Sequence, residues 1–438
     1  MVFLPGIFFI VKQTAEFPVD NFTAFKIKML NWANQFSIFC LLDNHRYGFE
    51  KPSFECLFGI GSKRNVTAAA GNAFETLKQF SNANECWLFG HFGYDLKNET
   101  EQLKSENFDG IGFPDLHFFE PEIVLQLTVD KLIIHADGDV QKIYSDINSC
   151  PAHIIEKETE AIEIKSRIDK QQYTGTVEKL RTHILRGDCY EINFCQEFFS
   201  ENAVIDPLSF YSKLSSLSPN PFSALYKLNE KYCICASPER YIKKSGSKII
   251  SQPIKGTSKR DISDARNDNA SRQHLLQSEK EKSENTMVVD LVRNDLSRVC
   301  MKGTVKVKEL FGIYSFPQVH QMISTIEGEV DDTIHWTDII KATFPMGSMT
   351  GAPKKRVMEL IEKYEQTKRG LFSGAIGYVM PSGDFDFNVI IRSILYNAEA
   401  SYISYQAGSA ITFNSEPEEE YRECLVKVSA IKNILKHR

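Results

Sequence analysis

The C-terminal half of the chain alternates apolar and polar positions in a way that predicts strands. Over Phe385–Tyr396 successive side chains fall on two unlike faces, and a second strand-like run covers Tyr402–Thr412. The segment Val379–Asp384, which contains Pro381 and Gly383, is typical of a turn between two strands. Successive strands joined by short turns pair antiparallel, so the pattern predicts large antiparallel sheets.

Helical spacing marks three other segments. A first helix is predicted over Gln171–Arg186 and ends at Gly187, a natural C-cap. Two long helices are predicted over Ser271–Arg298 and Pro353–Tyr364. The apolar positions with this spacing are Val177, Leu180, Ile184 and Leu185 in the first helix and Val357, Leu360, Ile361 and Tyr364 in the last. Together, strands and helices predict an α+β fold, with large antiparallel sheets packed together and flanked by helices.

The N-terminal part of the sequence is less regular. Short apolar or aromatic runs such as Phe36–Leu42 and Cys86–Tyr94 are broken by polar turns. The charged stretch Glu156–Lys170 is typical of a linker that enters a helix. We therefore predict two regions, residues 1–165 and 166–438, which are intertwined in one core.

Composition and charge exclude several classes of protein. The 438 residues are 42% hydrophobic, enough for a large core, and a net charge of −6 without a basic tract argues against a nucleic-acid partner. The longest apolar run, Val2–Val11, is too short to span a membrane and lacks a basic leader, so it predicts a strand, with a signal peptide as the alternative. Ten scattered cysteines without metal-ligand spacing predict reduced thiols in a cytoplasmic protein.

One lysine has an unusual setting. Pro253 and Gly256 bracket Lys255 and predict a tight, stiff turn around it. An amine held there in a partly desolvated pocket would be partly neutral and nucleophilic, and Lys259 and Arg260 would lower its pKa further if they lie near. The alternative is an ordinary solvated loop lysine.

Two pairs of glutamates suggest a metal. Glu281 and Glu284 are three residues apart on a predicted helix and share a face, and Glu420 and Glu423 have the same spacing. Solvated helix faces are the alternative for each pair. If the fold brings the four carboxylates together, they require a cation, and a hard ion with oxygen ligands such as Mg²⁺ fits.

These residues belong to a longer series of ordered motifs. The motifs are Gly187–Asn193, Ser237–Arg240, Pro253–Thr257, Glu284-Asn285 leading into Val289–Leu296, Phe344–Lys354, Ser373–Tyr378 and Glu420–Glu423. In this order they resemble the chorismate-utilising enzymes, a family that includes anthranilate, isochorismate, salicylate and aminodeoxychorismate synthases. The resemblance is continuous from about Tyr173 to Lys427 and weaker in the N-terminal part.

The resemblance implies a fold, an activity and a cofactor. The fold would be anthranilate-synthase-like, with a degenerate or regulatory region at 1–165, a chorismate-binding catalytic region at 166–438, and Mg²⁺ as cofactor. Aminodeoxychorismate synthases carry a lysine at the position of Lys255, whereas anthranilate and salicylate synthases usually carry alanine. We therefore expect amination of chorismate to 4-amino-4-deoxychorismate, for 4-aminobenzoate and folate synthesis. The alternatives are an anthranilate synthase component I and a non-catalytic regulatory subunit that binds an amino acid.

The resemblance also implies roles for individual residues. The expected catalytic residues are Lys255 as nucleophile, Glu239 as the acid that helps expel the 4-hydroxyl, and His320 against the substrate ring. The expected metal ligands are Glu284 and Glu423, assisted by Glu281 and Glu420. The expected substrate-binding residues are Thr350, Tyr378, Arg392, Gly408, Ser409 and Lys427. In the family the N-terminal part can hold tryptophan, near a segment that resembles Phe39–Asn44.

The expected partners are chorismate and a source of ammonia. The chain shows no Gly-x-Cys-x-Gly nucleophile turn with a downstream His-x-Glu, so ammonia would come from a glutamine amidotransferase subunit or from free ammonium. Two positions depart from the family pattern. Glu191 stands where water-using members have lysine and amine-using members commonly have glutamine. In Gly408-Ser409-Ala410, a stretch that is often glycine-rich, side chains are expected to crowd the approach to the substrate carboxylate.

Overall fold

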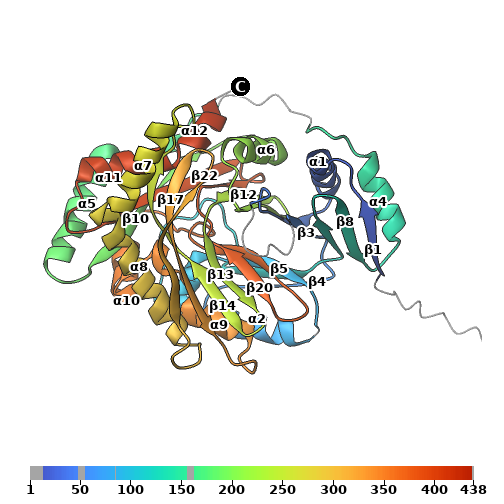
Figure 1. Ribbon diagram of the computed structural model, residues 1–438, viewed down its shortest axis with the longest axis horizontal. Coiled ribbons are helices and arrows are strands. Elements are labelled where there is room, and N and C mark those ends of the chain that lie inside the picture. The colour runs from blue at the N-terminus through green and yellow to red at the C-terminus, as the bar shows by residue number, and fades with distance from the viewer. Residues whose placement is uncertain (1–12, 48–54, 84, 155–161, 437–438) are drawn as a thin grey trace, which may run out of the picture.

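The computed structural model describes residues 13–47, 55–83, 85–154 and 162–436, so the strand expected at Val2–Val11 lies outside the described residues. Two sheets pack together and helices surround them, which confirms the predicted α+β class (Figure 1). All pairings between the strands of both sheets are antiparallel, as the alternating pattern predicts.

The first sheet has twelve strands and runs across both regions of the sequence. Its order is β1 (Gln13–Pro18), β8 (Lys131–Ala136), β7 (Ile123–Leu127), β3 (Cys56–Ile60), β2 (Ile38–Asp43), β11 (Phe222–Leu228), β12 (Lys231–Ser237), β21 (Ser393–Asn397), β22 (Tyr402–Ile411), β10 (Glu191–Ser200) and β18 (Gly351–Ala352), with β9 (Lys165–Ser166) also paired to β10. Strand β2 pairs with β11, with Cys40 opposite Tyr226. An N-terminal and a C-terminal strand are therefore direct neighbours.

The second sheet has ten strands and is built in the same way. Its order is β15 (Ile254–Lys259), β17 (Val319–Glu329), β14 (Lys248–Gln252), β13 (Arg240–Ser245), β20 (Phe385–Asn388), β19 (Ala375–Val379), β5 (Leu88–Phe92), β6 (Leu116–Glu120) and β4 (Arg64–Ala68), with β16 (Lys306–Ser315) paired to β17. Here β5 of the N-terminal part pairs with β19. Because both sheets contain strands from both regions, a boundary at residue 165 stays a prediction.

Twelve α-helices and two 3₁₀ helices are assigned within the described residues. They are α1 (Phe22–Ala33), α2 (Ala73–Asn82), η1 (Tyr94–Leu96), α3 (Lys97–Thr100), α4 (Val140–Ser149), α5 (Lys170–Leu185), α6 (Pro207–Leu217), α7 (Ala265–Gln277), α8 (Glu279–Ser297), α9 (Trp336–Thr343), η2 (Gly347–Met349), α10 (Lys354–Tyr364), α11 (Pro417–Lys427) and α12 (Ser429–Lys436). In Figure 1, α5, α7, α8 and α11 gather at one end of the molecule and α1 and α4 at the other.

Two apolar clusters hold these layers together. One lies between the first sheet and helices such as α1, α5 and α6, and includes Leu41, Tyr173 and Leu214. The other lies between the two sheets and includes Tyr226 of the first sheet and Phe387 of the second. Burial of this apolar surface is the main force that keeps the sheets face to face.

Three predicted elements are confirmed almost to the residue. Helix α5 begins after Asp169, whose side chain accepts a hydrogen bond from the Gln172 amide, and ends before Gly187, which has a positive φ. Helix α10 begins after Pro353, and β22 ends at Ile411, one residue before the predicted end.

Two predicted elements are each divided in the structure, so those predictions were wrong. The helix expected over Ser271–Arg298 breaks at Ser278, whose hydroxyl caps α8 by accepting a hydrogen bond from the Glu281 amide. The strand expected over Phe385–Tyr396 becomes β20 and β21, which belong to different sheets. The four residues between them carry the chain from one sheet to the other.

Neither a membrane helix nor a disulfide is found in the described part of the chain. No described helix is both long and apolar enough to cross a membrane. All ten cysteines lie in the described ranges as free thiols.

Candidate active site

Lys255 lies in an irregular strand and not in a tight turn, so that prediction was wrong. It belongs to β15, which pairs with β17 with a register shift between Ile254 and Thr257. Gly256 has a φ of +97°, a conformation that favours glycine, and a Cβ there would lie 3.0 Å from Glu281 Oε2. The irregularity thus allows the strand that carries Lys255 to approach helix α8 closely.

The amine of Lys255 is buried against carboxylates. Its Nζ lies 2.7 Å from Oε1 of Glu191, the first residue of β10, so the ion pair bridges the two sheets. Burial alone lowers the pKa of Lys255, but the charges of Glu191, Glu284 and Glu423 outweigh it and raise the pKa well above its usual value. The expectation of a partly neutral amine is therefore wrong: with these carboxylates around it the Lys255 amine stays protonated. Arg260, expected to depress the pKa, is paired with Asp268.

Glu239 is a buried carboxyl group with the properties of an acid. It lies between β12 and β13 and accepts a hydrogen bond of 2.6 Å from Ser348 Oγ. Burial raises the pKa of Glu239 to about 7, although Ser348, Lys255 and Arg392 oppose the shift. Glu239 is only 4% exposed and is therefore not a surface glutamate, and the neighbouring Arg240 pairs with Asp386 at 3.0 Å. A carboxyl with this pKa can donate a proton near neutral pH.

Arg392 ends the segment in which the chain crosses from the second sheet to the first. It has a φ of +51°, uncommon for a residue with a side chain. Burial lowers the pKa of Arg392 to about 10, and the charge of Glu239 partly opposes this. Among the described residues no hydrogen bond or ion pair holds the guanidinium, which leaves its fork of donors for a ligand carboxylate.

Four glutamates from α8 and α11 gather around one lysine. The Nζ of Lys280 lies 3.9 Å from Glu284 Oε1 and 3.8 Å from Glu420 Oε1. Burial raises the pKa of Glu284 to about 7, and burial together with the charge of Glu423 raises the pKa of Glu281. The structure therefore brings the two predicted pairs close enough to repel one another, as expected of carboxylates that share a cation.

The donor chemistry of this cluster fits Mg²⁺. Glu284 Oε1 and Glu420 Oε2 are buried without a hydrogen-bond partner, and charged oxygen donors are those that a hard cation prefers. Across the described ranges, however, no three His, Cys, Asp or Glu side chains already lie close enough to hold a metal ion. The Lys280 ammonium provides the positive charge in this structure, and magnesium binding stays a prediction.

The substrate-binding residues expected on β22 and α11 meet at one carbonyl. Lys427 Nζ donates to Gly408 O at 3.0 Å and lies 2.7 Å from Glu423 Oε1, and it lowers the pKa of Glu423. A Cβ at Gly408 would lie 1.9 Å from Phe194 O, so only glycine fits there. Ser409 was expected to crowd the approach to the substrate carboxylate, but its side chain points to the other face of the sheet. Its hydroxyl lies 3.3 Å from that of Tyr173, on the side covered by helices.

Thr350 belongs to a loop that is held firmly against β10. It is fully buried, and its carbonyl accepts a hydrogen bond of 2.8 Å from the Asn193 amide. The Asn193 side chain donates to Ser348 O at 3.0 Å. The loop thereby places Ser348 beside Glu239 and Thr350 at the end of the first sheet.

Sequence comparison agrees with this assembly. The profile of the chorismate binding enzyme family matches residues 39–433, which is most of the chain. The chain belongs to the chorismate binding enzyme family.

Individual relatives of this family are similar in sequence and in fold. The aminodeoxychorismate synthase component 1 of Salmonella typhimurium is 35% identical over 346 residues, which cover 78% of this chain and 75% of the relative. The anthranilate synthase component 1 of Acetivibrio thermocellus is 31% identical over 406 residues, covering 85% and 81%. The crystal structure of anthranilate synthase component I from Streptococcus pneumoniae TIGR4 matches with a TM-score of 0.74 at 25% identity, covering 89% of this chain and 94% of that one. The anthranilate-synthase-like fold is therefore confirmed.

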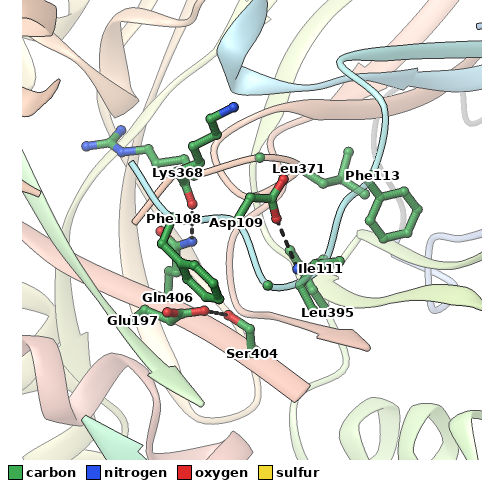
Figure 2. A pocket seen from close by; sticks show the side chains of 13 residues that line it. Phe108, Asp109, Ile111, Phe113, Glu197, Lys368, Leu371, Leu395, Ser404 and Gln406 are labelled. Atoms are coloured by element: carbon green, nitrogen blue, oxygen red, sulfur yellow. Dashed lines mark hydrogen bonds between the residues drawn. The ribbon is translucent and has the colours of Figure 1, made fainter. Parts of the chain in front are cut away.

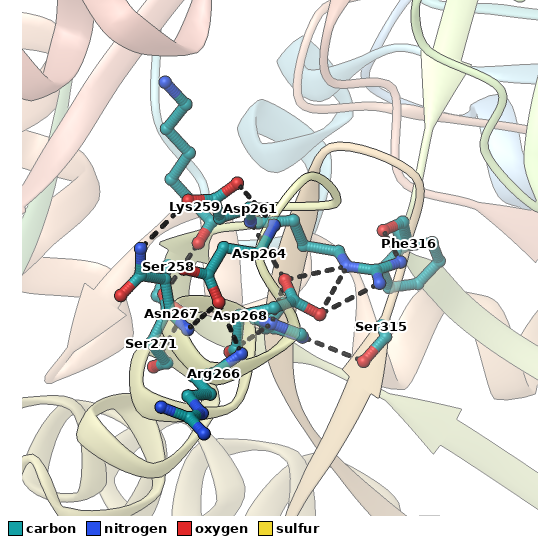
Figure 3. A network of polar contacts seen from close by, with 12 residues as sticks. Ser258, Lys259, Asp261, Asp264, Arg266, Asn267, Asp268, Ser271, Ser315 and Phe316 are labelled. Carbon is teal, nitrogen blue, oxygen red and sulfur yellow. Dashed lines mark hydrogen bonds and ion pairs between the residues drawn. The ribbon is translucent and has the colours of Figure 1, made fainter.

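His320 lies in a polar network on the helix side of β17. Its Nδ1 lies 2.8 Å from Ser315 Oγ and its Nε2 lies 3.1 Å from Asp268 Oδ1. Figure 3 shows Asp268 at the centre of this network, with Ser315 and Phe316 beside it. A hydrogen bond from Arg260 lowers the pKa of Asp268 to about 2, so the carboxylate stays charged. The network satisfies the imidazole completely, and a catalytic role for His320 stays a prediction.

The next residue, Gln321, was missed by sequence reasoning. It is fully buried, and neither its amide oxygen nor its amide nitrogen has a hydrogen-bond partner. It pairs with Thr257, two residues after Lys255, and strand alternation places its side chain on the face opposite His320. A buried amide without a partner, on the strand next to that of Lys255, is a candidate contact for a ligand. The sequence could have indicated it, because Gln321 follows His320 on a strand and so points to the opposite face.

Tyr378 and the segment Phe39–Asn44, near which tryptophan was expected to bind, both contact other side chains of the protein. The ring of Tyr378, on β19, lies 5.9 Å from that of Trp87, the residue before β5. In β2, the Asp43 carboxylate is buried, lies 2.7 Å from Lys26 Nζ and accepts a hydrogen bond of 3.1 Å from Tyr211. The roles expected for Tyr378 and for this segment stay predictions.

A pocket lies on a different part of the first sheet from these residues. Figure 2 shows Phe108, Asp109, Glu197, Ser404 and Gln406 around it. Its polar groups are occupied internally, since Glu197 accepts a hydrogen bond of 2.7 Å from Ser404, and Asp109 accepts one of 3.0 Å from the Ile111 amide. None of the predicted site residues lines it.

Proposed function

We propose that this chain is an aminodeoxychorismate synthase component that aminates chorismate with the help of Mg²⁺. The observation that carries the proposal is the Lys255 amine, buried between the two sheets and surrounded by Glu191, Glu239 and the carboxylates of α8 and α11. Relatives named aminodeoxychorismate synthase component 1, with 32–35% identity to this chain, support the same assignment.

The proposed reaction consists of two displacements at the chorismate ring. First, the Lys255 amine, after losing a proton, forms a bond to C2 while both conjugated double bonds of the ring shift by one position toward C4 and the C4–O bond breaks. Glu239 donates a proton to the departing 4-hydroxyl, which leaves as water. Ammonia then forms a bond to C4, both double bonds shift back, and the C2–N bond to Lys255 breaks. The enolpyruvyl group is retained throughout.

The remaining residues bind and orient the substrate. Arg392, with its unpaired guanidinium, would take a chorismate carboxylate in a bidentate contact. Glu284, Glu423, Glu281 and Glu420 would hold Mg²⁺, which when bound neutralises the acidic cluster and lets a second substrate carboxylate approach. Thr350, Gly408 and Lys427 would line the end of the site where the first sheet meets α11.

The proposal includes a second subunit. Because the relatives are named component 1, and because the sequence shows no amidotransferase motif, ammonia would come from a glutamine amidotransferase partner. Free ammonium at high concentration would replace that partner in vitro. Two observations oppose a non-catalytic regulatory subunit: both Glu pairs are intact, and Lys255 and Glu239 lie buried together.

One experiment tests the proposal directly. The purified chain is incubated with chorismate, Mg²⁺ and excess ammonium chloride, and the products are identified by mass and chromatography. The expected product is 4-amino-4-deoxychorismate, formed only when Mg²⁺ is present. Anthranilate as the main product would instead identify an anthranilate synthase component I. Absence of turnover with unaltered chorismate binding would favour the regulatory subunit.

A further inference from the structure

Glu191 is a buried carboxylate with one oxygen occupied and one oxygen unpaired. It is 3% exposed at the start of β10. Its Oε1 lies 2.7 Å from Lys255 Nζ, whereas its Oε2 is buried and has no hydrogen-bond partner. A buried acceptor left unpaired costs free energy, so this oxygen requires a donor that the folded chain does not supply.

Two other buried carboxylates, Glu197 on β10 and Glu365, which accepts from the Cys195 amide of β10, have no such oxygen. Glu197, on the same strand, uses Oε1 to accept from Ser404 and Tyr402 and Oε2 to accept from Arg167. Glu365 uses both of its oxygens to accept from Arg369, and one of them also accepts from a backbone amide. Both carboxylates are therefore satisfied, whereas Glu191, beside the lysine nucleophile, keeps one oxygen unpaired.

We propose that the free oxygen of Glu191 binds the ammonium or ammonia that reacts with chorismate, and that Glu191 positions this nitrogen beside the amine of Lys255. The inference rests on the proposed function, and it explains why a carboxylate stands at this position. Ammonium is small enough for a buried subsite and carries only donors and a positive charge, which complements an unpaired carboxylate oxygen.

The geometry of a carboxylate suits the two displacements. Its two oxygens stand in a 1,3 relation, and so do the ring carbons C2 and C4. A nitrogen on each oxygen would therefore present the leaving amine and the incoming amine side by side, one for each carbon. The preceding residue, Tyr190, is 70% exposed.

Kinetics with ammonium chloride as the sole amine source test the inference. In Glu191→Ala, the KM for ammonium should rise by about tenfold or more, the loss typical of a charge-assisted contact, while the KM for chorismate changes less than about twofold. Glu191→Gln keeps an acceptor oxygen without the charge and should give an intermediate KM for ammonium. Tyr190→Phe, the exposed neighbour, is the matched control and should leave both KM values unchanged.

A second readout separates ammonium binding from support of Lys255. Without ammonium, mass spectrometry follows the adduct on Lys255, whose mass is that of chorismate less water. An unchanged KM for ammonium in Glu191→Ala, with only slower adduct formation, would overturn the ammonium subsite and leave a role in holding the lysine. Failure of the parent chain to form aminodeoxychorismate would refute the proposed function itself. Thermal melting of each variant verifies that it is folded, and Glu191→Gln serves if Glu191→Ala is not.

Discussion

Two buried charge clusters contact strand β10, and they differ in how completely their polar atoms are paired. In one, Arg369 donates to Glu365 at 2.7 Å and 2.9 Å, to Met349 O at 2.6 Å and to Asn193 O at 2.8 Å. In the other, around Lys255, carboxylate oxygens of Glu191, Glu284 and Glu420 are buried without a hydrogen-bond partner.

The difference separates a structural ion pair from a binding site. Burying charge is costly, and a chain that buries it for structure recovers the cost by pairing every atom, as around Arg369. Atoms left unpaired in a folded protein indicate that a ligand completes them. We therefore expect changes in the paired cluster to reduce stability, and changes in the unpaired cluster to reduce activity with little loss of stability.

The largest expected effect concerns Lys255. Removing a covalent nucleophile in Lys255→Ala should reduce aminodeoxychorismate formation on the order of a thousandfold or more, while chorismate binding survives. The parent chain should accumulate, without ammonium, an adduct of chorismate less water on the peptide containing Lys255, and the variant should not. Undiminished product formation by the variant would show that Lys255 is not the nucleophile.

The second prediction concerns Arg369, the centre of the paired cluster. Arg369→Ala leaves the buried Glu365 carboxylate uncompensated and should lower the free energy of unfolding by about 3–5 kcal/mol. Urea denaturation followed by tryptophan fluorescence measures this loss. Lys255→Ala is the matched comparison, because it also removes a buried cation, and it should lose clearly less stability. Equal losses would break the distinction between the two clusters.

The third prediction concerns the metal. Glu284→Gln and Glu423→Gln should each abolish Mg²⁺-dependent turnover and leave the fold intact. The folded-state pKa of Glu284, about 7, lies above its ordinary value of 4.5, so its ionisation above pH 7 costs stability. The metal-free Glu284→Gln variant should therefore melt at a higher temperature than the parent at pH 8. Glu279→Gln, on the same helix with a side chain that is 88% exposed, is the control. A normal Mg²⁺ response in both variants would exclude these ligands.

The fourth prediction uses the pKa of Glu239. The acid must be protonated to expel the 4-hydroxyl, and its pKa of about 7 means that the protonated form is lost as the pH rises past 7. Glu239→Gln lacks the acid at every pH. The rate of adduct formation in the parent divided by that in the variant should therefore fall as the pH rises through about 7. Because Lys255 titrates in both proteins, the ratio isolates Glu239, and a constant ratio would exclude it as the acid.

The same comparison shows what could be predicted from the sequence. The paired strands, α5 and α10 follow from local periodicity and caps, which act within a few residues. The break at Ser278 was also readable, since a serine three residues before a glutamate is an N-cap pattern. The crossing after β20 was marked by three successive apolar residues, Val389–Ile391, which interrupt the alternation.

The partnership of Glu191 and Lys255 could not be predicted, because it depends on how two sheets face each other. The two residues lie on strands of different sheets, and no local pattern relates them. For the same reason the direction of the Lys255 pKa was wrong: burial and flanking cations were visible in the sequence, whereas the opposing carboxylates were not. The direction of the Ser409 side chain on β22 could not be predicted either, because it depends on which face of the sheet α5 covers.

The smallest expected effect concerns the neighbours His320 and Gln321, which repeat the contrast of the two clusters on one strand. Neighbouring residues on a strand point to opposite faces of the sheet. Only one of His320 and Gln321 can therefore point to the face on which the Lys255 amine lies. His320 is paired with Ser315 and Asp268, whereas Gln321 is unpaired on both amide atoms.

Gln321→Leu replaces an unsatisfied polar group by an apolar one of similar size. It should therefore raise the melting temperature while lowering kcat/KM for chorismate by about tenfold, the loss of one or two hydrogen bonds. His320→Leu breaks a satisfied network and should lower the melting temperature, with kcat/KM changed only a few-fold. Thermal melts and steady-state kinetics on the two variants decide between them. The reverse result, a catalytic loss confined to His320→Leu, would restore the histidine as the residue against the substrate ring.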